Sequence, residues 1–109
     1  MRVENPIHLG TPDVNCCADG VEFWVELKRV ESFPKLASTP VFTGCLKPEQ
    51  VLWHHARSRA GGVSYIVGLV ESEDKVYVVP GKYSMEFNSM TREKLDSLTL
   101  KLEDMWTTG

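Results

Sequence analysis

The alternation of apolar and polar residues predicts an α/β protein of the α+β type, with a central mixed β-sheet flanked by helices. The longest β-rich run is V-E-F-W-V-E-L-K-R-V, residues 21–30. Asp19-Gly20, just before it, is typical of a two-residue hairpin turn, so a first strand is expected upstream. Two further β-rich runs, residues 63–70 and 75–79, are separated by a short polar loop.

Two helices are expected after the hairpin. Pro48 suits a first helical position and Gly61-Gly62 a stop, which places the first helix over residues 48–60. Leu52 and Ala56, with Val51 as a further candidate, are expected to face the interior, opposite a stripe formed by Gln50, Trp53, His54 and Arg57. The second helix is expected from its cap, Thr91, to about Asp104. Its apolar stripe is expected to cover the sheet and contains Leu95, Leu98, Leu102 and Met105 or Trp106.

Residues 31–47 contain two prolines and a glycine and show no sustained periodicity. Loops this long in compact domains are often functional, so Phe33 and Lys35 are candidates to meet a substrate. The alternative is a surface excursion with a short strand near Val41-Phe42. The residues alone leave both interpretations open.

Charged residues interrupt the most apolar strand. Residues two apart on a strand share a face, so Trp24, Glu26 and Lys28 lie on one side, and Phe23, Val25, Leu27 and Arg29 lie on the other. Burying a carboxylate and an ammonium costs several kcal/mol unless they are paired or bind something. One interpretation is a Glu-Lys pair on a solvated face, and the other is a binding site.

The hairpin register favours the binding site. If Asp19-Gly20 is the turn, Ala18 pairs with Val21 and Asp13 lies opposite Glu26, with Cβ atoms about 5 Å apart on one face. Two carboxylates at that distance repel each other unless a cation lies between them or one is protonated. With Lys28 alongside, they form a candidate site for a hard divalent ion. A slip of one residue would place Asp13 on the opposite face.

Bulk properties indicate one intracellular globular domain. The chain has 109 residues, of which 42% are hydrophobic and 25% charged, and these values exclude extensive disorder. We find no apolar run long enough to cross a bilayer and no signal-peptide pattern. Cys16, Cys17 and Cys45 lack C-x-x-C spacing and are expected to be free thiols, and a zinc site with His54 and His55 is disfavoured.

The net charge of −3 argues against general affinity for nucleic acid, but its distribution does not. Residues 28–59 carry six basic and two acidic side chains, a local charge of +4 with His neutral. Binding to phosphates needs such a local patch rather than a basic chain.

The ordered motifs resemble the PD-(D/E)xK nuclease superfamily. Gly10-x-Pro12-Asp13 matches its first motif, and Glu26-Leu27-Lys28 matches its second. Pro48-Glu49-Gln50 then opens a helix that ends in Gly-Gly before a β-rich run. This set is most similar to the virus-type replication-repair (VRR-NUC) nucleases and to phage nucleases like Holliday-junction resolvases. It covers about residues 7–70 of a single nuclease-like domain, residues 1–109, whose C-terminal hairpin and helix span about residues 63–106.

The resemblance implies a restriction-endonuclease-like core and a metal-dependent DNA endonuclease, acting on structured or branched DNA and encoded by a virus or mobile element. Asp13, Glu26 and the backbone carbonyl of Leu27 would hold Mg²⁺ or Mn²⁺, with no organic cofactor. Lys28 would orient or deprotonate the attacking water, and Gln50 would position that water or the metal. The expected DNA contacts come from Arg29, Lys35, Lys47, His54, Arg57 and Arg59. A homodimer in the cytoplasm of a virus-infected cell is expected, without membrane association.

The chain departs from the family pattern in one respect. Related nucleases often carry another acidic residue on a helix before the first motif, whereas Glu4 is the sole acid among residues 1–9. Either Glu4 reaches the site, or water completes the metal shell. The alternative function is a DNA-binding or assembly module that keeps the fold and has lost turnover.

Overall fold

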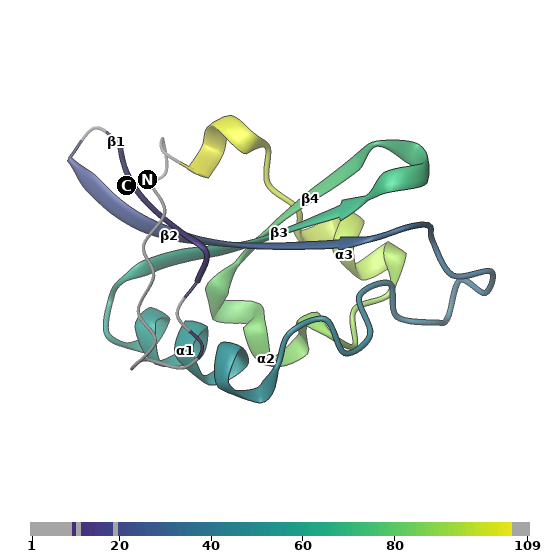
Figure 1. Ribbon diagram of the computed structural model, residues 1–109, viewed down its shortest axis with the longest axis horizontal. Coiled ribbons are helices and arrows are strands. Elements are labelled where there is room, and N and C mark those ends of the chain that lie inside the picture. Colours follow the sequence, from purple (N-terminus) through teal and green to yellow (C-terminus); the bar gives the residue numbers. More distant parts are fainter. Residues whose placement is uncertain (1–9, 11, 19, 106–109) are drawn as a thin grey trace.

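The computed structural model describes residues 10, 12–18 and 20–105. Within them the fold is α+β, with three α-helices and one four-stranded mixed sheet of order β1-β2-β3-β4 (Figure 1). The strands are β1 (Val14–Ala18), β2 (Val21–Val30), β3 (Val63–Val70) and β4 (Lys75–Pro80), and the helices are α1 (Pro48–Arg59), α2 (Ser84–Phe87) and α3 (Arg92–Leu98). Short 3-10 segments are η1 (Glu71–Glu73), η2 (Gly81–Tyr83) and η3 (Leu102–Met105). The predicted mixed sheet flanked by helices is confirmed.

The hairpin has the predicted register. Strands β1 and β2 pair antiparallel from Ala18 opposite Val21 to Val14 opposite Val25. Gly20 has a φ of +78°, a conformation that suits glycine in a tight turn. Asp19, its partner in the expected turn, lies outside the described residues. Because β1 begins at Val14, Asp13 lies just before the paired region.

Strand β2 occupies the interior of the sheet because β3 pairs with its other edge in parallel, from Phe23 opposite Val63 to Val30 opposite Val70. Helix α1 lies in the crossover between the two parallel strands, as parallel pairing requires. Strand β4 then pairs antiparallel with β3. The charged residues of β2 therefore lie in the middle of a sheet, beside β3.

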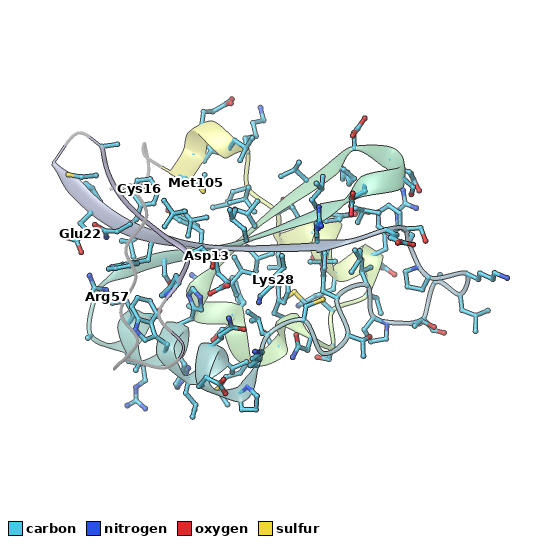
Figure 2. All side chains as sticks on the ribbon, in the orientation of Figure 1. Asp13, Cys16, Glu22, Lys28, Arg57 and Met105 are labelled. Atoms are coloured by element: carbon cyan, nitrogen blue, oxygen red, sulfur yellow. The ribbon has the colours of Figure 1, made fainter. Side chains whose placement is uncertain are left out.

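The sheet separates two hydrophobic clusters. In Figure 1, α1 and α2 lie on one side of it and η3 on the other. The larger cluster lies on the helical side and includes Phe42, Leu46, Ile66, Tyr77, Val79, Phe87 and Leu95. The smaller cluster contains Phe23, Val25, Tyr65, Val78 and Met105. Figure 2 shows Met105 and Cys16 on that second side of β2, with Lys28 and Arg57 on the helical side.

The predicted interior face of α1 was wrong in part, although Val51 does pack against the larger cluster. Leu52 is 62% exposed and Ala56 is exposed, whereas His54 is the buried residue of α1. The helix therefore turns part of its polar stripe toward the sheet, because His54 and Gln50 contact the carboxylate of Glu26 on β2. Phe33 is half-buried: its ring packs edge-to-face on Tyr77, and the guanidinium of Arg92 lies 3.9 Å from its centroid.

The C-terminal region contains a short helix and a separate 3-10 segment where one longer helix was predicted. Thr91 caps α3 as expected, accepting a hydrogen bond from the backbone N–H of Lys94 at 3.3 Å. The helix ends at Leu98 instead of near Asp104, because Leu100 forms a β-bridge with Val78. Trp106 lies outside the described residues.

Residues 41–44 form turns, not the alternative short strand, although Val41 and Phe42 are buried. Among the described residues, no helix combines the length and apolarity needed to cross a membrane.

Candidate active site

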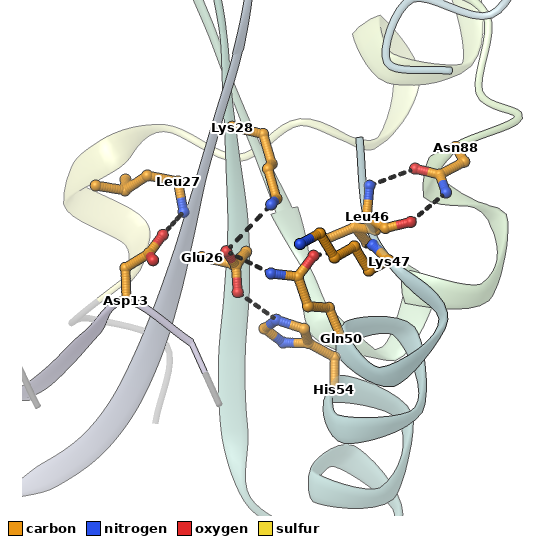
Figure 3. A network of polar contacts seen from close by, with 9 residues as sticks. All are labelled: Asp13, Glu26, Leu27, Lys28, Leu46, Lys47, Gln50, His54 and Asn88. Atoms are coloured by element: carbon orange, nitrogen blue, oxygen red, sulfur yellow. Dashed lines mark hydrogen bonds and ion pairs between the residues drawn. The ribbon is translucent and has the colours of Figure 1, made fainter. Parts of the chain in front are cut away.

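Glu26 lies at the centre of a group of polar side chains from β2 and α1 (Figure 3). Its side chain is only 1% exposed. Oε2 accepts a hydrogen bond from Nε2 of Gln50 at 3.3 Å and lies 3.5 Å from Nζ of Lys28. Lys28 is itself 18% exposed. The pair is therefore not the solvated Glu-Lys pair of the simpler interpretation, because the carboxylate is sealed from water.

The carboxylate of Asp13 is hydrogen-bonded to the backbone at the edge of the same strand, β2. It is exposed, and its Oδ2 accepts a hydrogen bond from the backbone N–H of Leu27 at 2.9 Å. In Figure 3 the Asp13 carboxylate turns to the backbone of Leu27, while the Glu26 carboxylate faces Gln50, His54 and Lys28. The expected side-by-side pairing of the two acids is thus replaced by two separate sets of contacts, because Asp13 has left the strand ladder. Glu26 and Leu27 are nevertheless adjacent in β2, so Asp13 is bonded to the residue that directly follows Glu26.

The backbone carbonyl of Leu27 faces the edge where Asp13 lies. In an antiparallel pair, one residue directs its N–H and its C=O to the same neighbouring strand. The N–H of Leu27 reaches Asp13 on the β1 side, and β1 pairs no further along β2 than Val25. The carbonyl is therefore directed toward an edge that β1 does not cover, as a metal ligand requires.

Gln50 is held from both ends. Its Oε1 accepts a hydrogen bond from the backbone N–H of Lys47 at 2.9 Å, at the start of α1. This contact fixes the amide so that Nε2 is directed to Glu26. The residue before Lys47 is anchored as well: the side chain of Asn88 bonds both backbone groups of Leu46, at 2.9 Å and 2.8 Å. The N-terminus of α1 is thus fixed relative to Glu26.

His54 was expected to contact DNA, and this prediction was wrong because the side chain is 0% exposed. Its Nδ1 lies 2.8 Å from Oγ of Ser64 on β3. Its Nε2 lies 3.9 Å from Oε1 of Glu26, and within the described part of the chain neither of these two buried atoms has a hydrogen-bond partner. Sequence reasoning missed Ser64 and Asn88 entirely. For His54 a signal was present, because it lies four residues after Gln50 on the same helical face.

Lys28 also borders the loop before α1. Burial raises the pKa of the Cys45 thiol, and the nearby positive charge of Lys28 acts in the opposite direction. All three cysteines are free, as predicted. The loop that carries Cys45 therefore passes close to Lys28.

The remaining predicted DNA contacts differ in position. Lys35, Lys47 and Arg59 are exposed. Arg57 is 37% exposed and bonds Oε1 of Glu22 at 3.1 Å. Arg29 is 76% exposed and pairs with Glu71 at 3.8 Å. Strand alternation places Arg29 on the sheet face opposite Glu26, so it cannot share one surface with the residues of α1.

Metal ligation rests on few protein groups. Over residues 10, 12–18 and 20–105, no three His, Cys, Asp or Glu side chains gather in a group able to hold an ion. Glu4, the candidate for a third carboxylate, lies outside that part of the chain. Two carboxylates and a carbonyl still suit Mg²⁺, which keeps several waters and often takes only one or two protein carboxylates. The contacts from Gln50 and Lys28 use only part of the acceptor capacity of the Glu26 carboxylate, so capacity remains for such an ion.

No model of a known protein family matches the chain, and neither does any curated protein sequence.

Proposed function

We propose that the protein is a metal-dependent DNA endonuclease of the PD-(D/E)xK type, built on a restriction-endonuclease-like core, that hydrolyses phosphodiester bonds in structured or branched DNA. We further propose that a virus or mobile element encodes it. The observation that carries this proposal is the buried carboxylate of Glu26, contacted by both Lys28 and Gln50. These three residues match three family positions that are separated in sequence, and here they meet at one carboxylate. Asp13, the fourth, bonds the strand residue next to Glu26.

Asp13, Glu26 and the carbonyl of Leu27 would hold Mg²⁺ or Mn²⁺. When bound, the ion supplies Lewis-acid stabilisation of the charge on the phosphate and lowers the pKa of its bound water. The protein contributes the orientation of the ligands. Gln50 fixes Oε2 of Glu26 from α1, and the hydrogen bond from Leu27 holds Asp13 at the strand edge.

Lys28 would act on the attacking water. Its ammonium lies 3.5 Å from Oε2 of Glu26, and its side chain as a whole is 18% exposed, so the residue is partly open to solvent. An ammonium there can orient a water by hydrogen bonding, and as a neutral amine it can accept the proton of that water. Gln50, with its amide fixed at both ends, would position Glu26 and the water together.

DNA would be held by exposed basic residues near the start and end of α1. Lys47 and Arg59 lie at its two ends, and Lys35 lies on the preceding loop. Cutting two strands of a branched substrate requires two sites, so the proposal includes a homodimer. Size-exclusion chromatography with light scattering tests that part directly.

A DNA-binding module without turnover is the second candidate. The observation that favours it is the absence of a third metal-ligating side chain within the described residues. Such a module would bind DNA in a salt-sensitive manner and cut nothing.

A cleavage assay separates the two functions. Purified protein is incubated with supercoiled, linear and four-way-junction DNA in Mg²⁺, in Mn²⁺ and in EDTA. The nuclease predicts cleavage that requires metal and is lost in Glu26→Gln and Lys28→Met. Salt-sensitive binding without cleavage would support the binding module, and cleavage unchanged in both variants would exclude this site.

A further inference from the structure

The buried histidine of α1 has no role in the nuclease proposal above. His54 lies between Ser64 on β3 and Glu26 on β2, with Nδ1 2.8 Å from Oγ of Ser64 and Nε2 3.9 Å from Oε1 of Glu26. Both facing atoms are buried, and neither has a hydrogen-bond partner among residues 10, 12–18 and 20–105. A buried polar atom without a partner costs free energy, so two such atoms facing each other call for an explanation.

Ser64 is compatible with either imidazole tautomer, because its hydroxyl can donate to Nδ1 or accept from it. In a neutral imidazole one ring nitrogen carries the proton and the other accepts. If the Ser64 hydroxyl donates to Nδ1, the proton lies on Nε2 and points to the carboxylate of Glu26. That carboxylate can only accept, so this tautomer is the one in which the groups are complementary.

The fold leaves space for this contact at a third element. Gly81, at the start of η2, lies against both side chains: a Cβ there would collide with Oγ of Ser64 and approach Nδ1 of His54 to 3.2 Å. The absence of a side chain at position 81 thus keeps Ser64 against His54. Three segments distant in sequence combine to direct one nitrogen at Glu26.

We infer that His54 is a positioning residue for the metal site, which donates from Nε2 to Oε1 of Glu26 when that carboxylate binds a divalent ion. The inference rests on the proposed function. A carboxylate has about four acceptor positions, so donors from Gln50, Lys28 and His54 orient it and still leave room for a cation. Such outer partners of a ligand typically contribute roughly 10- to 100-fold in metal affinity.

Two substitutions separate the two ends of the imidazole. Asparagine places its amide near Nδ1, where it can still meet Ser64, but it does not reach Glu26. Glutamine is one carbon longer and places its amide nitrogen near Nε2. We therefore expect His54→Asn to weaken Mn²⁺ binding by roughly 10- to 100-fold and His54→Gln to bind more tightly than His54→Asn. The neighbouring substitution His55→Asn is the matched control and should bind as the wild type does.

The measurement is isothermal titration of the full chain with Mn²⁺ in the absence of DNA, with urea unfolding in EDTA as a check on folding. Mn²⁺ binding by His54→Asn equal to that of wild type, or binding by His54→Gln as weak as that of His54→Asn, would overturn the inference. If His54→Asn does not fold, Ser64→Ala provides the test: it keeps the imidazole, and it should also weaken binding, whereas unchanged affinity would overturn the inference. Glu26→Gln distinguishes the two proposals. If wild type binds and Glu26→Gln does not, an unaffected His54→Asn overturns only this inference, whereas a wild type that binds no Mn²⁺ overturns the nuclease site as well.

Discussion

The backbone N–H of Leu27 donates a hydrogen bond to Oδ2 of Asp13 at 2.9 Å, although Asp13 lies outside the paired part of β1. The side chain thereby takes the place that a strand carbonyl would occupy. This contact holds one acid at the strand edge, beside the residue that follows Glu26. Asp13 therefore has two properties that substitutions can separate: the hydrogen bond that it accepts from Leu27 and the negative charge that it would offer to a metal ion.

Asp13→Asn and Asp13→Ala separate them. Asparagine keeps an acceptor for Leu27 and loses the charge, so its free energy of unfolding should stay within about 0.5 kcal/mol of wild type. Alanine loses the bond as well and should cost about 1 kcal/mol. Both variants should lose Mn²⁺ affinity, because only the carboxylate is a good ligand. Urea unfolding and calorimetric titration measure the two effects, and an Asp13→Asn variant that binds Mn²⁺ like wild type would remove Asp13 from the site.

Much of this arrangement could be predicted from the sequence, because local chemistry determines it. The turn expected at Asp19-Gly20 predicted the register that places Val14 opposite Val25. Pro48 and Gly61-Gly62 bounded α1, which runs from Pro48 to Arg59. The turn and cap signals act within a few residues, so they survive in the sequence. The contact of Gln50 with Glu26 was expected only from the resemblance to the nuclease superfamily.

What could not be predicted depends on contacts between distant segments. The inward face of α1 contains His54 because its imidazole lies between Ser64 and Glu26. No local sequence pattern indicates that Leu52 is exposed instead. Similarly, the bridge between Leu100 and Val78 shortens the last helix, although its apolar stripe continues in sequence. In both cases tertiary packing overrides amphipathic periodicity.

Lys28 is expected to matter for stability mainly through Glu26. Its Nζ lies 3.5 Å from the Glu26 carboxylate, which is 1% exposed. Lys28→Met therefore leaves the buried negative charge of Glu26 without its nearest positive charge. We expect a cost of about 1–3 kcal/mol, less than for a fully buried pair, because Lys28 is partly solvated. In the Glu26→Gln background the same substitution should cost at least about 1 kcal/mol less. Urea unfolding of the four proteins gives the coupling, and an equal cost in both backgrounds would show that the pair does not interact.

Gln50→Glu should convert a hydrogen bond into a repulsion. Glutamate keeps the acceptor for Lys47 but cannot donate to Glu26, which lies 3.3 Å from the present amide nitrogen. Without metal, the variant should unfold about 1–3 kcal/mol more easily at neutral pH. With Mn²⁺ it should gain more stability than wild type gains, because a third carboxylate then faces the ion. Thermal unfolding with and without Mn²⁺ measures this, and an equal gain in both proteins would place the ion away from Gln50.

Alkaline pH should destabilise the protein through Tyr77. Burial and the hydrogen bond to Asp96 raise the pKa of Tyr77 to about 12 from its ordinary value of 10.0. Above the ordinary value the unfolded chain ionises while the folded one does not, so this contribution to stability is present at lower pH and lost as pH rises toward 12. The loss should approach about 2–3 kcal/mol.

Tyr77→Phe is the control for that effect. It removes the hydrogen bond from the Tyr77 hydroxyl to Asp96 at 2.9 Å and should cost about 1 kcal/mol at neutral pH. It lacks the titrating group, so its free energy of unfolding should fall less steeply than that of wild type between about pH 9 and about pH 12. Parallel pH profiles for the two proteins would contradict the assignment to Tyr77.

The metal geometry itself is tested most directly by a crystal of the protein soaked in Mn²⁺, with data collected for anomalous scattering. We predict an anomalous peak within about 2.0–2.4 Å of a carboxylate oxygen of Asp13, one of Glu26 and the carbonyl oxygen of Leu27. A well-diffracting soaked crystal with no peak there, or with Mn²⁺ bound by only one of the two acids, would contradict it.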